Sequence, residues 1–243
     1  MSTRSETIIE THQLVKSFGG VQATDKVDFA LKEGELRCVI GPNGAGKSTF
    51  FKLLTGQIIP TSGKILFAGQ DVTGLPSHKI ARLGVGIKNQ KPDVFDGLLV
   101  RENLWLAAQF AHDKAGAEHQ VDKVIDRLQL GSLAHRLVGE LAHGQRQWVE
   151  IGMVMAREPR LILLDEPSAG MSQDERVRTA DLLKELNRTT TIVVVEHDMQ
   201  FIKRIADIVT VFHRGAILRE AHVDVVLKDP EVRNVYLGRT EVV

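Results

Sequence analysis

A glycine-rich segment, set between an apolar run and a helical pattern, constrains this chain more than any other feature. It reads Gly41-Pro42-Asn43-Gly44-Ala45-Gly46-Lys47-Ser48-Thr49 and fits the phosphate-binding pattern of two spaced glycines followed by Lys and Ser or Thr. The run Leu36–Ile40 predicts a buried strand before the segment, and residues 47–56 predict a helix after it. Glycines let backbone N–H groups turn toward anionic oxygens, and the positive end of the helix strengthens anion binding. The sequence therefore predicts a strand–loop–helix unit that binds a nucleoside triphosphate.

Two side chains of this loop have predicted roles of their own. Lys47 supplies a positive charge for the β- and γ-phosphates, and the Ser48 hydroxyl can bind Mg²⁺. The remaining loop residues, from Gly41 to Gly46 and at Thr49, are expected to surround the phosphates.

The order of strand and helix patterns predicts an α/β fold. Four short apolar segments at residues 36–40, 161–164, 191–195 and 208–212 suit the buried strands of a mostly parallel sheet, and helical patterns such as 174–187 lie between them. The phosphate loop is then expected at the carboxyl end of a strand. Residues 8–36 alternate short apolar segments with Gly-containing turns, which predicts an antiparallel β subdomain.

Between about Lys91 and Pro159 the strand patterns disappear, and helical periodicity covers residues 101–111, 117–130 and about 145–157. We therefore expect one domain over residues 5–243. In it, residues 5–90 and 159–243 form the nucleotide-binding core with its β subdomain, and residues 91–158 form an inserted helical subdomain.

Acidic residues follow the second buried strand. The run Leu161–Leu164 ends in Asp165 and Glu166, and neighbouring side chains on a strand point to opposite faces. We expect Asp165 to bind Mg²⁺ through water, and Glu166 to act as the base that polarises the attacking water.

The phosphate loop and the acidic pair suggest roles for two further polar residues. His197 follows the next apolar strand, where its imidazole can donate to the γ-phosphate and hold the attacking water. Gln90 lies where the core gives way to the helical region, where its amide could bind the metal and sense the γ-phosphate.

The segment Leu141-Ala142-His143-Gly144-Gln145-Arg146-Gln147 leads directly into a helix and forms a further anion site. With it, the chain resembles the ATPase subunits of ABC transporters, whose signature is usually Leu-Ser-Gly-Gly-Gln and is matched by Gly144 and Gln145. The resemblance runs in order through the phosphate loop, Gln90, the signature, Asp165-Glu166 and His197. Phe18 matches the aromatic residue that stacks on adenine.

This resemblance implies a P-loop NTPase core of the RecA-like type that hydrolyses ATP with Mg²⁺, with Lys47, Glu166 and His197 as catalytic residues. It also implies that two ATPase subunits close head to tail. Each ATP then lies between one phosphate loop and the partner's signature, which is Ala142, His143, Gly144 and Gln145 in this chain.

Three residues depart from the family pattern. Ala142 and His143 replace the usual Ser and Gly of the signature, and the loss of a hydroxyl donor removes about 1–2 kcal/mol of phosphate binding. Ser172 stands where the loop after the catalytic Glu usually carries Asp. Because that loop crosses the dimer interface, the coupling between the two sites is the property that this change affects.

Local segments resemble one branch of the family. The stretch from Thr73 to Gly84 and Val235-Tyr236-Leu237-Gly238 are similar to importers of branched-chain amino acids. Within that group, Gln90-Lys91-Pro92, the Ala-His-Gly-Gln form of the signature and Val195-Glu196-His197-Asp198-Met199 resemble the urea and short-chain amide subgroup. Urea or a short-chain amide is therefore the expected solute, with branched-chain amino acids as the alternative.

The resemblance also implies partners and a location. The expected partners are integral membrane permease subunits, a second ABC ATPase in a homodimer or heterodimer, and indirectly an extracytoplasmic solute-binding protein. The groove between core and insert, near residues 90–103, is expected to receive the permease. The chain is then peripheral, on the cytoplasmic face of the membrane.

Composition limits the alternatives. Lys plus Arg and Asp plus Glu both number 31, so no net charge directs the chain toward nucleic acid. The apolar runs are too short to span a bilayer, and residues 1–11 are too polar for a signal peptide. A soluble non-transport ABC ATPase, a small-molecule kinase and a nucleotide-binding regulator without turnover remain as less favoured functions.

Overall fold

A six-stranded sheet forms the centre of the molecule in the computed structural model, which describes residues 7–89 and 93–237. Its strand order is β10-β9-β3-β8-β7-β6. The strands are β3 (Leu36–Ile40), β6 (Val85–Lys88), β7 (Leu161–Asp165), β8 (Thr191–Val195), β9 (Ile208–His213) and β10 (Ala216–His222). All neighbouring strands pair in parallel except β9 and β10, which are antiparallel.

The inner strands of this sheet are buried on both faces. Along β7, Ile162 and Leu164 pack into one hydrophobic cluster, while Leu161 and Leu163 pack into a second cluster on the opposite face. Strand β8 alternates in the same way, which explains why both strands read as continuous apolar runs rather than alternating ones.

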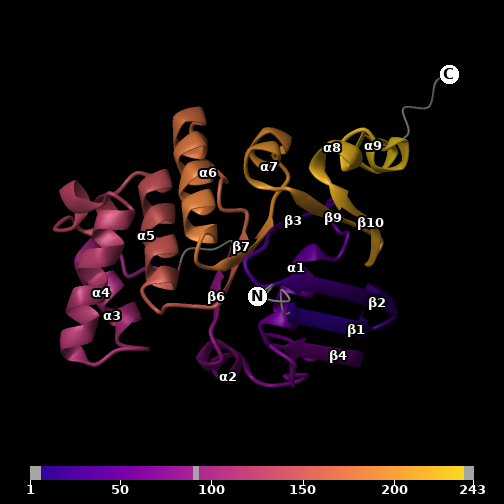
Figure 1. Ribbon diagram of the computed structural model, residues 1–243, viewed down its shortest axis with the longest axis horizontal. Coiled ribbons are helices and arrows are strands. Elements are labelled where there is room, and N and C mark those ends of the chain that lie inside the picture. The colour runs from indigo at the N-terminus through magenta and orange to yellow at the C-terminus, as the bar shows by residue number, and fades with distance from the viewer. Residues whose placement is uncertain (1–6, 90–92, 238–243) are drawn as a thin grey trace, which may run out of the picture.

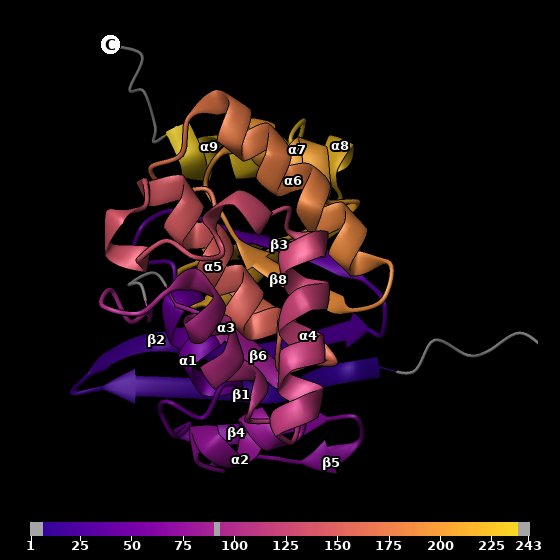
Figure 2. The same cartoon turned by 90° about the vertical axis from the view of Figure 1, so that its left-hand side faces the viewer.

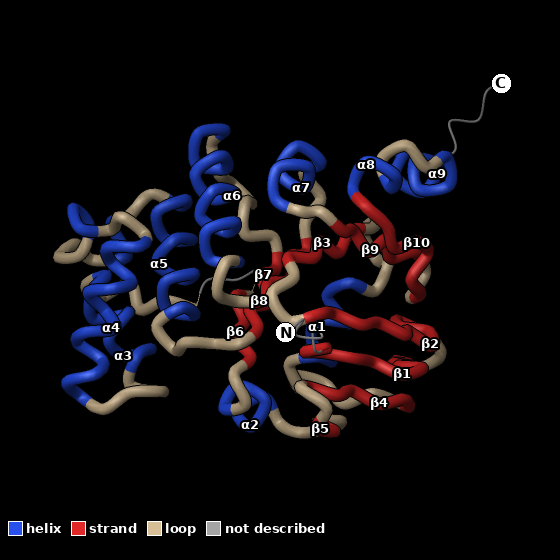
Figure 3. The backbone as a smooth tube through the Cα atoms, viewed as in Figure 1, coloured by secondary structure: helices blue, strands red, loops and turns tan. Residues whose placement is uncertain are grey.

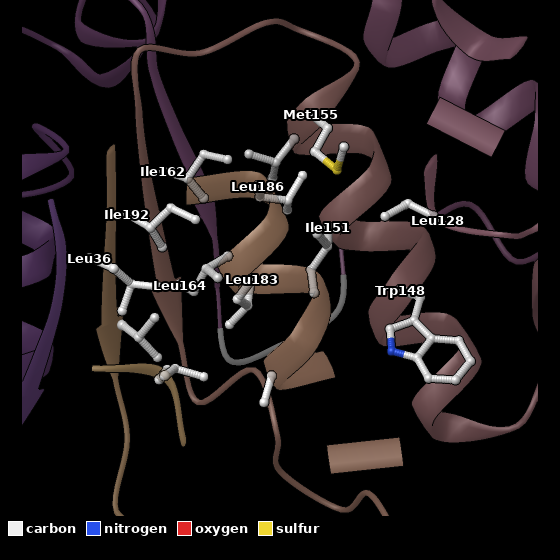
Figure 4. Packing of buried hydrophobic residues seen from close by; sticks show 14 of the residues in the cluster. Leu36, Leu128, Trp148, Ile151, Met155, Ile162, Leu164, Leu183, Leu186 and Ile192 are labelled. Carbon is white, nitrogen blue, oxygen red and sulfur yellow. The ribbon is translucent and has the colours of Figure 1, made fainter. Parts of the chain in front are cut away.

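The first cluster lies under the helices. It joins the sheet to α5 (His143–Met155) and α6 (Gln173–Asn187), as Figure 4 shows for Ile151, Leu164 and Leu183. Trp148 of α5 adds a polar link, because its Nε1–H donates to Thr179 Oγ1 of α6 at 2.9 Å.

The second cluster holds a separate antiparallel sheet against the core. This sheet has the order β2-β1-β4-β5 and is formed by β1 (Thr7–Phe18), β2 (Val21–Lys32), β4 (Ser62–Phe67) and β5 (Gln70–Asp71). Helix α1 (Lys47–Leu54) contributes Phe50 to the same cluster, where its ring lies 5.3 Å from that of Phe29 and 5.1 Å from that of Phe212. The antiparallel strands and α1 lie side by side in Figure 1.

A group of helices extends to one side of the sheet, where α3 (Val100–Ala108), α4 (Lys114–Arg127) and α5 lie together in both ribbon views (Figures 1 and 2). Two short 3₁₀ turns, Gly131–Leu133 and Val138–Glu140, lead from α4 to α5. The remaining helices are α2 (Ser77–Arg82), α7 (Met199–Ile205), α8 (Val223–Val226) and α9 (Pro230–Leu237).

The α/β class, the mostly parallel sheet and the antiparallel subdomain are confirmed (Figure 3). Strand β6 was not expected, because Val85-Gly86-Ile87-Lys88 contains a glycine and a lysine and has no long apolar run. The helix predicted over 47–56 ends at Leu54, and the one predicted over 101–111 ends at Ala108. The division at residues 90 and 159 stays a prediction, since one buried cluster runs through both parts.

Candidate nucleotide site

The phosphate loop connects the end of β3 to the start of α1, as the sequence predicts. Gly46 precedes α1 with φ of 104°, and a Cβ there would lie 2.3 Å from the Ala23 carbonyl oxygen. A Cβ at Gly41 would lie 2.3 Å from the Phe212 carbonyl oxygen. The backbone of β2 and β9 therefore packs against the loop so closely that both positions require glycine.

Lys47 is the first residue of α1, and its side chain turns back over the loop. Its Nζ donates to the Gly41 carbonyl oxygen at 2.6 Å and to the Pro42 carbonyl oxygen at 3.0 Å. Burial lowers the pKa of Lys47, and the negative charges of Glu166 and Asp165 oppose that shift. The ammonium group therefore lies within electrostatic range of both acids.

Strand register brings the carboxyl ends of three strands to one edge of the sheet. Val195 of β8 pairs with Asp165 of β7 on one side and with Val39 of β3 on the other. The ladder continues past the strand ends, because the Glu166 N–H donates to the Val195 carbonyl oxygen at 2.9 Å. The predicted phosphate loop, acidic pair and histidine thus emerge next to one another.

Asp165 and Glu166 differ in backbone conformation. Asp165 is the last residue of β7, whereas Glu166 lies beyond the strand with φ of 48°, in the left-handed region. Strand alternation was expected to send the two side chains to opposite faces. That reason was wrong, because Glu166 lies outside the strand and the turn after β7 sets the direction of its side chain. Burial raises the pKa of Asp165, as does the charge of Glu166, while Lys88, Lys47 and Lys52 lower it.

His197 lies two residues beyond the end of β8 and faces the acidic turn. Its Nδ1 is 3.6 Å from Glu166 Oε1, and its side chain is 65% exposed. An imidazole exposed at this edge can donate a hydrogen bond to a ligand bound there.

The other residues predicted to contact the nucleotide differ in their exposure. Ser48 is exposed at the start of α1, as are Asn43 and Gly44, whereas Thr49 is half-buried and Ala45 is buried. Phe18 is 49% exposed at the end of β1, in the hairpin whose second strand brings Ala23 to Gly46. Gln90 lies outside the described residues.

The signature segment lies at the start of α5, with Ala142 preceding the helix. His143 Nε2 is 3.1 Å from the Ala169 carbonyl oxygen, and the Cα of Gly144 faces Glu175, whose Oε1 would lie 2.2 Å from an added Cβ. Gln145 Oε1 accepts from the Ala142 N–H at 3.2 Å. Among the described residues, no hydrogen bond or ion pair joins this segment to the phosphate loop of the same chain.

Two residues, one in the loop after Glu166 and one directly after β8, have roles that the sequence did not indicate. Ser172, noted as a departure from the family, begins α6, and its Oγ accepts from the Glu175 N–H at 3.4 Å. Serine is a favoured residue at that position, so its presence has a local structural reason. Glu196, beside His197, is 1% exposed, and no pattern in the sequence marks it as buried.

A groove of about 450 Å³ opens between the core and the helical segment. Phe95, Leu106 and Phe110 line it and are 56%, 40% and 46% exposed. At its base the buried Lys88 Nζ lies 3.3 Å from Glu150 Oε2. Burial raises the pKa of Glu150, and Lys88 opposes the shift. None of the described helices has the length and apolar content that crossing a membrane requires.

This fold and this loop define a P-loop nucleotide-binding protein. The family model described as ABC transporter matches residues 24–169. The chain is 33% identical to the high-affinity branched-chain amino acid transport ATP-binding protein BraF of Pseudomonas aeruginosa, over 96% of this chain and 99% of that protein. It is 34% identical, with the same two coverages, to the corresponding protein LivG of Escherichia coli K12.

The fold is also similar to an ATP-binding cassette of an ABC transporter solved in its ADP conformation. The TM-score is 0.87 at 29% identity, over 96% of this chain and 99% of that one. The chain therefore belongs to the ABC transporter family, as an ATP-binding protein of the branched-chain amino acid transporter group. It is an ABC transporter ATPase that binds ATP.

Proposed function

We propose that this chain is the ATPase subunit of an importer in which Lys47, Glu166 and His197 hydrolyse ATP. The observation that carries the proposal is the shared edge of β3, β7 and β8, where the register aligns Val39, Val195 and Asp165. A ligand phosphate held by the loop at this edge would have the acid and the imidazole beside it.

The loop binds the triphosphate through its backbone N–H groups and the start of α1. Lys47 Nζ, now on the Gly41 and Pro42 carbonyl oxygens, would exchange these acceptors for phosphate oxygens. Phe18 stacks on the adenine from the β1–β2 hairpin.

Mg²⁺ fits the oxygen donors at this edge. The Ser48 hydroxyl and the Asp165 carboxylate, together with Gln90, would hold the ion with waters and phosphate oxygens. Burial raises the pKa of Asp165, as does the charge of Glu166, so a cation bound beside this carboxylate would stabilise its charged form. When bound, the ion neutralises charge on the phosphates.

Glu166 orients and polarises the attacking water, and His197 donates to the γ-phosphate. The 3.6 Å between His197 Nδ1 and Glu166 Oε1 leaves both groups within reach of one water molecule. Replacing Glu166 with Gln should stop hydrolysis and retain ATP binding. Wild-type turnover by that variant would exclude Glu166 as the base.

We further propose that each site is completed by a second ATPase subunit. The signature of this chain contacts Ala169 and Glu175 rather than its own phosphate loop, so it is available for a partner's ATP. Closure then depends on ATP, because only the closed pair completes both sites.

The permease partner would bind in the groove lined by Phe95, Leu106 and Phe110, which would place the chain on the cytoplasmic face of the membrane. An exposed apolar patch of this kind is typical of a protein contact. Leu106 and Leu137 form a matched pair for the test, being 40% and 38% exposed, with only Leu106 in the groove. Leu106→Asp should abolish co-purification with the permease, and Leu137→Asp should preserve it. Equal retention by both variants would contradict this docking site.

The relatives BraF and LivG support a branched-chain amino acid as the solute, delivered by an extracytoplasmic binding protein. Urea or a short-chain amide is the second candidate, because the signature carries Ala142 and His143 in the form that resembles that subgroup. Uptake of labelled leucine and of labelled urea by membrane vesicles containing the whole transporter separates the two. ATP-dependent uptake of urea alone would exclude the first solute, and uptake of leucine alone would exclude the second.

A further inference from the structure

Glu196 is a buried acid for which the proposed chemistry has no use. It follows the last residue of β8 and is 1% exposed, with its side chain fully covered. Burying a carboxylate is costly unless hydrogen bonds replace its contacts with water. Its partners therefore indicate what it does.

Both oxygens of Glu196 accept hydrogen bonds, and they face two different loops. Oε1 accepts from the Ser168 N–H at 3.0 Å and from the Ser168 Oγ–H at 2.5 Å. Oε2 accepts from the His197 N–H at 3.0 Å and from the Asp198 N–H at 3.4 Å. One carboxylate thus joins the loop after β7 to the loop after β8.

The two loops carry the two groups that must stay close. Ser168 lies two residues after Glu166, within a turn in which the Ala169 N–H donates to the Glu166 carbonyl oxygen at 3.2 Å. Glu166 has φ of 48°, a conformation that non-glycine residues rarely adopt without support from their surroundings. The bonds from Ser168 to Glu196 provide such support on one side, and the bond from His197 fixes the other loop.

The donor pattern explains why an acid stands at this position. A carboxylate only accepts, and its two oxygens can take about four donors, which matches the four that Glu196 receives. Glutamine would place an NH₂ group against at least one backbone N–H. The amide would settle with its NH₂ toward Ser168, because the Ser168 hydroxyl can rotate to accept whereas the two N–H groups at residues 197 and 198 cannot.

We propose that Glu196 is a positioning residue that sets the distance between Glu166 and His197. The proposal rests on the roles given above to those two residues. Glu196 does not touch the nucleotide; it acts by holding the turn at residues 166–169 against the loop at residues 196–198.

The test compares steady-state hydrolysis and ATP binding for the full-length protein and its variants. Glu196→Gln should lower kcat roughly ten- to hundredfold, the equivalent of one or two charge-assisted hydrogen bonds, and leave the Kd for ATP within about twofold. Glu35→Gln is the control, because Glu35 also accepts from a buried partner, Arg37, but at the opposite end of β3. It should leave kcat unchanged.

A double-mutant cycle separates positioning from general loss of stability. If Glu196 acts through His197, His197→Ala should lower kcat much less in the Glu196→Gln background than in the wild type. Additive effects would overturn the proposal, as would wild-type kcat in Glu196→Gln. If Glu196→Gln fails to fold, Glu196→Asp keeps an acceptor-only group one methylene shorter and should reduce kcat; full activity would overturn the proposal.

The same data distinguish this inference from the proposed function. Full turnover by Glu166→Gln or by His197→Ala would contradict the catalytic roles, and the positioning role would fall with them. Loss of turnover in those two variants, with full turnover in Glu196→Gln, would contradict the positioning role alone.

Discussion

Replacement of Gly46 by Ala tests the packing of the phosphate loop directly. Gly46 has φ of 104°, and an added Cβ would lie 2.3 Å from the Ala23 carbonyl oxygen, about 0.7 Å inside the closest separation that Cβ atoms tolerate. The unfavourable φ costs about 1–3 kcal/mol. Displacing the backbone of the loop or of β2 adds roughly 1–3 kcal/mol. A shift approaching 1 Å in a phosphate-binding backbone should also weaken ATP binding strongly.

Gly20 provides the control for this substitution, since its φ is 112° and an added Cβ would meet nothing within 4 Å. Gly20→Ala should therefore show the cost of the φ angle without the collision. We expect Gly46→Ala to melt roughly 2–12 °C below Gly20→Ala, because the collision costs about 1–3 kcal/mol and about 1 kcal/mol shifts the Tm of a chain this long by 2–4 °C. Differential scanning calorimetry measures the two Tm values, and titration calorimetry measures ATP binding. Equal Tm values, with wild-type ATP affinity in Gly46→Ala, would refute the close approach of β2 to the loop.

Three further predictions follow from other contacts. Lys47→Ala should weaken ATP binding roughly 10- to 100-fold through the loss of charge-assisted bonds to phosphate, and unchanged affinity in titration calorimetry would contradict that contact. Asp165→Asn should raise the Tm at pH 7.5 without Mg²⁺ or nucleotide. Burial raises the pKa of Asp165, so its contribution to stability is present below the ordinary Asp pKa and is lost as pH rises through the raised value. The gain should vanish near pH 4, and a lower Tm at pH 7.5 would contradict this sign. Trp148→Phe should lower stability by about 1 kcal/mol, because it removes the bond to Thr179 Oγ1; denaturant unfolding that matches the wild type would show that this bond contributes nothing.

The parts of this fold that the sequence predicts are those with strong local patterns. The loop from Gly41 to Thr49 specifies the turn between β3 and α1, and the doubly buried strands β7 and β8 read as apolar runs. Strand β6 escapes prediction because its pairing with β7, a contact distant in the sequence, makes it a strand. Its Lys88 is buried through a charge partner, Glu150, that lies 62 positions further along the chain.

In the candidate site, too, residues in strong local patterns are predicted and residues that depend on tertiary contacts are not. Lys47, Asp165, Glu166 and His197 stand in sequence patterns that identify them, and strand order then brings them together. Glu196 is identified only by its bonds to Ser168, because nothing in the sequence shows that an acid beside a histidine faces inward. The left-handed φ of Glu166 is likewise imposed by tertiary contacts, since glutamate has no preference for that region.

The central claim is that each ATP site needs two subunits, and the molecular mass of Glu166→Gln with ATP tests it most directly. In sedimentation, that variant should be a monomer without nucleotide. When Mg·ATP is added, it should become a dimer that holds two ATP molecules. The specific activity of the wild type should rise with protein concentration. A Glu166→Gln protein that binds ATP as a monomer, together with wild-type turnover per chain that does not change on dilution, would contradict the claim.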